Sequence, residues 1–461
     1  MQKKNTKSSD ETSSLFINSV YPVLKNNTNH KYEYRNEIYA TKHGFFSRIM
    51  IGTCTFVLIS LILSPVIKIQ HVAAQPAILK DADLKVESVV SGLSSPTSMV
   101  FINNNNILVL EKDGNVRLVS NGQLHSQPVL HVSVDVTSER GLLGIAVMNT
   151  SSSISNNNNS NKIALLYYTE SQGGGELRNK VYRYEWNGQS LINPKLILDL
   201  PGLPGPNHDG GKLTIGPDGY LYAVIEDLNH RGQVQNIKNG PPPDDTGGIF
   251  RMNPNDGSLA NKNNPFLTEA SLNKYYAYGI RNSFGLGFDP ITGNLWDTEN
   301  GLNTYDEINL VKPGFNSGWI QVMGPISRSG INEDQLVNFS GSHYADPVFS
   351  WLKPVAPTAI EFLKSSKLGP KYTNNIFAGD YITGNLYFFE LNKTRTGFNF
   401  NIELQPGLSD LVADNKREVS EVTFATGFGG ISDIKTGPEG YLYVLSVKDG
   451  SLFRILPATT P

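Results

Sequence analysis

The sequence predicts an all-β protein whose strands form small sheets around a ring, a six-bladed β-propeller. Glycine and proline number 43 and 26, and tyrosine and phenylalanine number 20 and 21. This mixture suits a chain of many turns and aromatic strands. A turn containing glycine with Asp, Asn, Glu or Thr, followed by an aromatic or leucine-rich strand, recurs without helical periodicity between the copies. A large β-sandwich or a solenoid is the alternative for the same texture.

The recurring unit sets the expected strands. Its copies are Lys112-Asp113-Gly114 before NVRLV, Gly216-Pro217-Asp218-Gly219 before YLYAVIED, Asp289 to Gly293 before NLWDTEN, Thr383-Gly384 before NLYFFEL, and Gly437-Pro438-Glu439-Gly440 before YLYVLSV. Such turn residues favour tight chain reversals, and aromatic strands pack between sheets. We expect each copy to mark one blade.

The N-terminal part has a different texture. Residues 1–48 are polar and predict a disordered cytoplasmic tail. Residues 49–67 (IMIGTCTFVLISLILSPVI) carry no charge and are long enough to span a bilayer. Lys42 and Arg48 precede them and favour a cytoplasmic N-terminus. The alternative is a cleaved signal segment, since Val72-Ala73-Ala74 offers small residues for cleavage.

The domain plan follows from this contrast. Residues 68–84 are expected to be a linker and residues 85–456 the propeller. The propeller should therefore lie outside the cytoplasm, anchored to the membrane through the N-terminal helix, or secreted if that segment is cleaved.

Composition excludes several functional classes. Charged residues are 18% and the net charge is −3, so no basic field predicts a nucleic-acid partner. Cys54 is the single cysteine, and a disulfide, a zinc cluster and thiol catalysis are therefore excluded within one chain.

The strongest candidate for chemistry is His208, in the segment Pro204–Asp227. It lies between Asn207 and Asp209, ahead of two glycines and a strand. A histidine on a loop at a strand edge can act as an accessible base. Asn207 or Asp209 could fix the imidazole tautomer, and the glycines would let a ligand approach the backbone. A plain surface histidine is the alternative.

Two later segments support a site. Tyr278–Phe288 (YGIRNSFGLGF) offers Arg281 and Asn282 just before a glycine-rich strand. Residues 297–310 (DTENGLNTYDEINL) hold four carboxylates close together, and hard oxygen donors at this density suit Ca²⁺. A solvated acidic loop is the alternative for the second segment.

These segments, in this order, resemble the glucose/sorbosone dehydrogenase family of quinoprotein sugar dehydrogenases over about residues 85–456. The matching stretches are GLSSPTSM (Gly92–Met99), ERGLLGIAV (Glu139–Val147), NHDGGKLTIGPDGYLY (Asn207–Tyr222), GGIFRMNPNDGS (Gly247–Ser258), YGIRNSFGLGF, ENG with DEINL, and GFNSGW (Gly314–Trp319). ERGLLG together with GDYITG is similar to the hedgehog-interacting-protein-like branch.

The resemblance implies a six-bladed propeller that oxidises an aldose sugar to its lactone with pyrroloquinoline quinone (PQQ) and Ca²⁺. His208 would be the base that takes the proton of the anomeric hydroxyl while hydride passes to the quinone. Arg281 would lie beside the quinone carbonyl, with Asn282 next to it. The remaining implied positions are Glu139, Asn207 and Lys212 for the cofactor, the backbone of Gly301 and Leu302 for one calcium, and Asp306 and Glu307 for a second.

The chain departs from the family where basic residues are expected to meet the three carboxylates of PQQ. Ile382, Gly430 and Ser432 stand at those positions. Arg140 and Lys212 would compensate only if they point into the channel. The departures leave open a non-enzymatic calcium-containing propeller that binds carbohydrate or a protein partner, and a calcium-dependent lactonase.

Overall fold

A computed structural model of the chain describes residues 77–149, 162–171, 176–260 and 264–459. The predicted tail, apolar segment and most of the linker lie outside these residues. Within the described ranges, no helix is long and apolar enough to cross a membrane.

The strands of the described residues form six sheets. The first three are β3 (Pro96–Phe101), β4 (Asn106–Glu111), β5 (Asn115–Ser120) and β6 (Gln123–Leu124) with β7 (Leu130–His131); β8 (Leu142–Asn149), β9 (Lys162–Glu170), β10 (Arg178–Trp186) and β11 (Leu191–Pro201); and β12 (Leu213–Ile215), β13 (Leu221–Ile225), β14 (Gly248–Met252), β15 (Tyr275–Tyr278), β19 (Phe315–Asn316) and β20 (His343–Tyr344).

The other three sheets follow in chain order, except for their outermost strands. They are β16 (Ser283–Phe288), β17 (Leu295–Glu299), β18 (Asp306–Val311), β21 (Phe349–Trp351) and β25 (Val412–Ala413); β22 (Pro357–Phe362), β23 (Ile376–Asp380), β24 (Leu386–Phe389), β26 (Thr423–Thr426) and β1 (Ile78–Leu79); and β27 (Ile431–Thr436), β28 (Leu442–Ser446), β29 (Ser451–Pro457) and β2 (Leu84–Ser91).

Helices are few. The α-helix α1 spans Lys416–Val422 and is capped by Asn415, whose side chain accepts from the backbone of Arg417 and Glu418. The 3₁₀ turns are η1 (Gln233–Gln235), η2 (Ile326–Arg328), η3 (Glu333–Gln335), η4 (Pro370–Tyr372) and η5 (Pro406–Leu408). The predicted all-β propeller class is confirmed.

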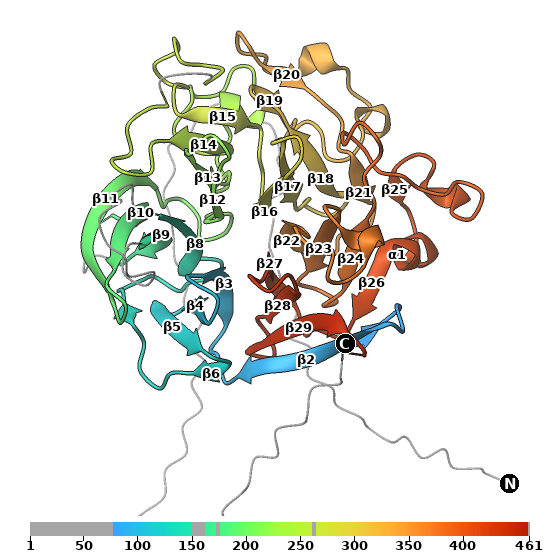
Figure 1. Cartoon of the computed structure of the whole chain (residues 1–461). Coiled ribbons are helices and arrows are strands. Elements are labelled where there is room, and N and C mark those ends of the chain that lie inside the picture. The colour runs from blue at the N-terminus through green and yellow to red at the C-terminus, as the bar shows by residue number, and fades with distance from the viewer. Residues whose placement is uncertain (1–76, 150–161, 172–175, 261–263, 460–461) are drawn as a thin grey trace, which may run out of the picture. The chain divides into compact units, whose positions relative to one another are not determined.

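The sheets close into a ring (Figure 1). Their first strands contact one another in the order β3, β8, β12, β16, β22 and β27, and β27 returns to β3. The last sheet joins both ends of the described chain, because β2 pairs with β29; they lie side by side as the blue and red arrows of Figure 1. This pairing ties β2, near the N-terminal end of the described chain, to the last three strands and leaves the ring without a gap.

The apolar core lies between consecutive sheets, and a strand contributes side chains to it on both of its faces. On β9, Ile163, Leu165 and Tyr167 pack toward the third sheet, whereas Ala164, Leu166 and Tyr168 pack toward the first. Successive side chains of a strand point to opposite faces, so a sheet buried on both faces needs apolar residues at every position. The central part of β9, IALLYY (Ile163–Tyr168), meets this requirement.

The recurring turn occupies two different places. The copies before β13, β17 and β28 join the first and second strands of their sheets. Those before β5 and β24 join the second and third strands, at the opposite end of the ring. Each copy lies in a different sheet, but the copies do not occupy one fixed position within a sheet, because any tight reversal favours the same residues.

Candidate active site

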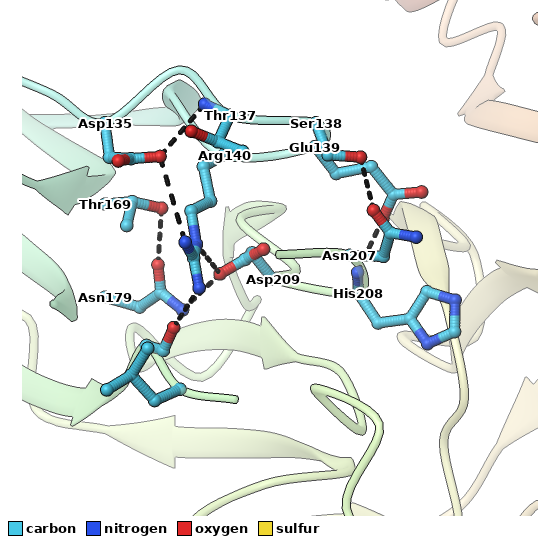
Figure 2. A network of polar contacts seen from close by, with 12 residues as sticks. Asp135, Thr137, Ser138, Glu139, Arg140, Thr169, Asn179, Asn207, His208 and Asp209 are labelled. Carbon is cyan, nitrogen blue, oxygen red and sulfur yellow. Dashed lines mark hydrogen bonds and ion pairs between the residues drawn. The ribbon is translucent and has the colours of Figure 1, made fainter. Parts of the chain in front are cut away.

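His208 lies on the loop that enters β12, at the end of the ring where the first strand of each sheet begins. Its φ is +65°, and Gly210 and Gly211 follow at +79° and +115°. Glu139 holds this turn, since its Oε2 accepts from the backbone N–H of His208 at 2.6 Å. His208 is 7% exposed, and Figure 2 shows its ring turned away from the neighbouring Arg140 and Asp209.

Asp227 fixes the imidazole of His208. Its Oδ1 lies 2.6 Å from His208 Nδ1 and also accepts from the backbone N–H of Asn229 at 2.8 Å. Its Oδ2 accepts from Trp319 Nε1 at 2.6 Å. A carboxylate only accepts, so it favours the tautomer with the proton on Nδ1 and leaves the lone pair on Nε2. The pair thus has the arrangement of an oriented general base.

Arg281 lies on the loop that enters β16 and is 7% exposed. Its backbone N–H donates to Glu299 Oε1 at 2.6 Å. Its guanidinium donates to the carbonyls of Asn300 and Gly301 at 2.7 and 3.1 Å and lies 5.1 Å from the centre of the Trp319 ring. These contacts fix the direction of the guanidinium.

The same residues link His208 and Arg281. Trp319 donates a hydrogen bond to Asp227, and Asp227 also contacts the imidazole of His208. The ring of Trp319 lies beside the guanidinium of Arg281. The backbone N–H of Asp227 also donates to the carbonyl of Arg281 at 3.1 Å. The two predicted residues therefore belong to one buried network, whereas their catalytic roles stay a prediction.

Arg140 does not point into the ring. Its guanidinium donates to the carbonyl of Gly202 at 2.6 Å, and its Nε lies 3.6 Å from Asp209 Oδ1 (Figure 2). Burial raises the pKa of Asp209 to about 6, against the opposing effects of Asn179 and Arg140. Arg140 thus supports the loop that carries His208 and is not available as a compensating cation.

Lys212 crosses the ring. It precedes β12, and its Nζ bonds to Asp433 Oδ1 on β27 at 2.6 Å, although β12 and β27 are not neighbours in the ring. Lys435 and Ser98 also contact Asp433. Although burial alone would raise it, Lys212 and Lys435 lower the pKa of Asp433 to about 2. Lys212 therefore reaches across the ring, but its charge is already paired.

Two predicted amides lie at the site with different surroundings. Asn207 Oδ1 accepts from the hydroxyl of Ser138 (Figure 2). The carbonyl of Asn282 accepts from the backbone of Asn300 at 2.7 Å. The side-chain oxygens of Asn282 and Asn300 and the Nε of Arg281 are buried without a hydrogen-bond partner among the described residues. Buried polar atoms without a partner are expected where a polar ligand, an ion or a water molecule binds.

The carboxylates of Asp306 and Glu307 are buried and accept hydrogen bonds from backbone N–H groups. Asp306 accepts from three backbone N–H groups, those of Gly301, Val355 and Ala356, at 2.9, 2.6 and 2.6 Å. Glu307 accepts from the backbone of Gly324 at 2.5 Å. Across the described ranges, no group of three or more His, Cys, Asp or Glu side chains is arranged to hold a metal ion. Both calcium assignments stay predictions.

The backbone positions predicted for calcium differ in exposure. The carbonyl of Gly301 already accepts from Arg281, whereas Leu302 is 49% exposed. Burial raises the pKa of Glu299 and, more strongly, those of Asp297 and Glu307. A cation beside these three buried carboxylates would lower their pKa values.

Three buried residues of the site were not predicted from the sequence: Asp227, Trp319 and Glu226. Asp227 and Trp319 come together from distant parts of the sequence, so spacing alone gives no signal for their contact. Glu226 is fully buried beside Asp227; burial and the charges of Glu139, Asp209 and Asp227 raise its pKa well above the ordinary value. The one available signal was the pair of acids that directly follows a buried strand.

A ring of sheets with an oriented imidazole and a fixed guanidinium at one end defines a β-propeller enzyme. The profile of the Glucose / Sorbosone dehydrogenase family matches residues 93–454. The chain belongs to this family, and it is an oxidoreductase.

Individual relatives agree. The aldose sugar dehydrogenase YliI of Escherichia coli is 25% identical over 383 residues, which cover 82% of this chain and 94% of that protein. A putative oxidoreductase (glucose dehydrogenase) from Thermus thermophilus superposes with a TM-score of 0.63 at 28% identity, covering 81% of this chain and all of that one. The PQQ-bound aldose sugar dehydrogenase of Streptomyces coelicolor shares the fold, with a TM-score of 0.59 at 24% identity and coverage of 82% and 99%.

The predicted likeness to the hedgehog-interacting-protein-like branch is also present. The HIPL1 protein of Arabidopsis thaliana is 29% identical over 140 residues, which cover 27% of this chain and 20% of that protein.

Proposed function

We propose that the protein oxidises an aldose sugar to its lactone with PQQ as the electron acceptor. The observation that carries the proposal is the network of His208, Asp227, Trp319 and Arg281, which leaves His208 Nε2 free to take a proton. Family membership supports the sugar substrate, and the PQQ-bound relative of the same fold supports the cofactor.

The residues present fit PQQ at one end of the ring. The unpaired oxygens of Asn282 and Asn300 and the unpaired Nε of Arg281 offer contacts to a polar planar group. Arg281 and Asn282 would hold the quinone end, and the carbonyls of Gly301 and Leu302 would supply oxygen ligands to Ca²⁺. When bound, PQQ supplies a two-electron acceptor and Ca²⁺ polarises its carbonyl.

The chain's own residues supply the proton transfer. His208 takes the proton of the anomeric hydroxyl at Nε2, and the Asp227 carboxylate stabilises the imidazolium that forms. The electron pair of the anomeric C–H bond leaves as hydride, so the hemiacetal carbon becomes the lactone carbonyl. Arg281 places a positive charge where negative charge develops.

The proposed function is tested by loading the protein with PQQ and Ca²⁺ and following dye reduction with a panel of aldoses. His208→Ala should abolish the reaction while the circular dichroism spectrum and melting temperature stay unchanged. Absence of PQQ binding at saturating Ca²⁺, measured by fluorescence titration, would refute the proposal and favour a non-enzymatic propeller.

We also propose that each of the six sheets is one blade and that the propeller lies outside the cytoplasm. The second proposal rests on residues 49–67, whose apolar length suits a membrane anchor. Protease added to intact cells should cleave the propeller if it is anchored outside; complete protection of a cell-bound protein would contradict the proposal.

A further inference from the structure

Lys448 lies at the same end of the ring as His208 and Arg281. It belongs to the turn between β28 and β29, and the residues that flank this turn pair at the start of β27. Its Nζ donates to the carbonyls of Tyr381 and Ile382 at 2.7 and 3.2 Å and lies 4.4 Å from the centre of the Tyr381 ring. Lys448 is exposed, so its ammonium group meets solvent beside the inner strands.

The side chain of Lys448 takes space that Gly430 leaves free. A Cβ at position 430 would lie 3.1 Å from both Cδ and Cε of Lys448 and 2.9 Å from the carbonyl oxygen of Tyr381. Gly430 also has a φ of +90°, a conformation that other residues rarely adopt. A side chain at position 430 would therefore strain the backbone and would require Lys448 to move from its present position.

Lys448 lies next to two of the positions at which the chain departs from the family. Basic residues are expected at positions 382 and 430, and Lys448 contacts the backbone of the first and fills the space beside the second. One lysine from a neighbouring turn thus stands where two cations are missing from the sequence.

The positive charge of Lys448 is also available to an anionic ligand. Within the residues that the structure describes, no carboxylate lies within ion-pair distance of its Nζ, whereas Lys212 and Arg140 are both paired with aspartates. An ammonium group has three N–H donors, and two carbonyls take two of them. One donor is left for an anion.

We propose that Lys448 binds a carboxylate group of the ligand that occupies this end of the ring. The proposal rests on the proposed function and adds a residue that neither the family resemblance nor the sequence spacing assigned. The carboxylate belongs either to PQQ or to an acidic sugar such as a uronate; in both cases the ammonium group forms a charge-assisted hydrogen bond.

The test compares Lys448→Gln and Lys448→Arg with the unchanged protein in the presence of Ca²⁺. PQQ affinity is measured by fluorescence titration, and glucuronate affinity is measured calorimetrically against glucose. Lys367→Gln is the matched control, because Lys367 is an exposed lysine on the β22–β23 connection at the other end of the ring. Melting temperatures check that all variants fold.

Lys448→Gln should weaken PQQ or glucuronate about ten-fold, Lys448→Arg should restore most of the affinity, and Lys367→Gln should change nothing. The loss should shrink as salt is raised. Weaker PQQ binding identifies the cofactor as the source of the carboxylate, and weaker glucuronate binding alone identifies the sugar.

Two further outcomes would overturn the assignment. If PQQ and glucuronate bind Lys448→Gln as tightly as the unchanged protein, Lys448 has no such role and the proposed function stands. If the unchanged protein binds neither probe, both the assignment and the use of PQQ are refuted.

Discussion

Replacing Asp227 with asparagine isolates the orienting role of one carboxylate. Asp227 accepts from Trp319 Nε1, from the backbone of Asn229 and from His208 Nδ1. An amide has one oxygen and one NH₂ group, so it cannot accept on both sides. If its oxygen faces Trp319, its NH₂ meets His208 and favours the tautomer with the proton on Nε2, which removes the base.

We expect the Asp227→Asn variant to lose about 10³-fold in kcat/KM for sugar oxidation, or about 4 kcal/mol of transition-state stabilisation. The assay is dye reduction by the protein loaded with PQQ and Ca²⁺, with PQQ affinity measured in parallel. The opposite orientation of the amide places NH₂ against the Trp319 N–H and loses a hydrogen bond, so neither arrangement is neutral.

The chain offers a matched control. His230 Nδ1 lies 2.6 Å from Asp244 Oδ2, the same distance as in the His208–Asp227 pair. This second pair meets the site through the backbone alone, because the backbone N–H of His230 donates to the carbonyl of Asp227 at 2.7 Å. Asp244→Asn should leave kcat/KM within about two-fold of the unchanged protein. Equal losses in the two variants, or an Asp227→Asn variant that keeps its activity, would refute the tautomer argument.

The remaining predictions concern stability. Lys212→Met leaves Asp433 buried with one cation fewer and should lower the free energy of unfolding in urea by about 3 kcal/mol. The control Arg417→Met breaks an exposed pair and should cost less than about 0.5 kcal/mol. Equal costs would contradict a stabilising role of the Lys212–Asp433 pair. The raised pKa of Asp209, about 6 in the fold, means that the folded state binds this proton more tightly, so the stability it gives is present below about pH 4 and lost as pH rises through 6, by up to about 3 kcal/mol. Asp209→Asn should flatten that slope in pH-dependent urea unfolding, and an unchanged slope would contradict it. Adding EDTA should lower the melting temperature, because a bound ion stabilises only the folded state; no shift would remove the calcium assignment at Asp306 and Glu307.

The strands could be predicted because their signals are local. Short apolar runs and Gly-Asp turns act over a few residues, and NVRLV and YLYAVIED form strands as expected. The places of the turns within the blades could not be predicted, because the same residues serve reversals at both ends of the ring.

The site could be predicted in part for the same reason. His208 and Arg281 stand out by their flanking glycines and asparagines, and both lie in the network described above. Asp227, Trp319 and Lys448 were missed because their partners lie far away in the sequence. Asp227 and Trp319 are 92 residues apart although both follow strands of the third sheet, and Lys448 reaches Tyr381 beside the fifth sheet. The pairing of Lys212 with Asp433 could not be predicted, because it depends on a contact across the ring that no sequence spacing reveals.

A crystal structure of the protein soaked with PQQ and Ca²⁺ tests the joint action of His208 and Arg281 most directly. We predict the quinone beside the Arg281 guanidinium, with His208 Nε2 facing the position where the sugar's anomeric hydroxyl would lie. PQQ bound at any other place, or no PQQ at a saturating concentration, would contradict the account.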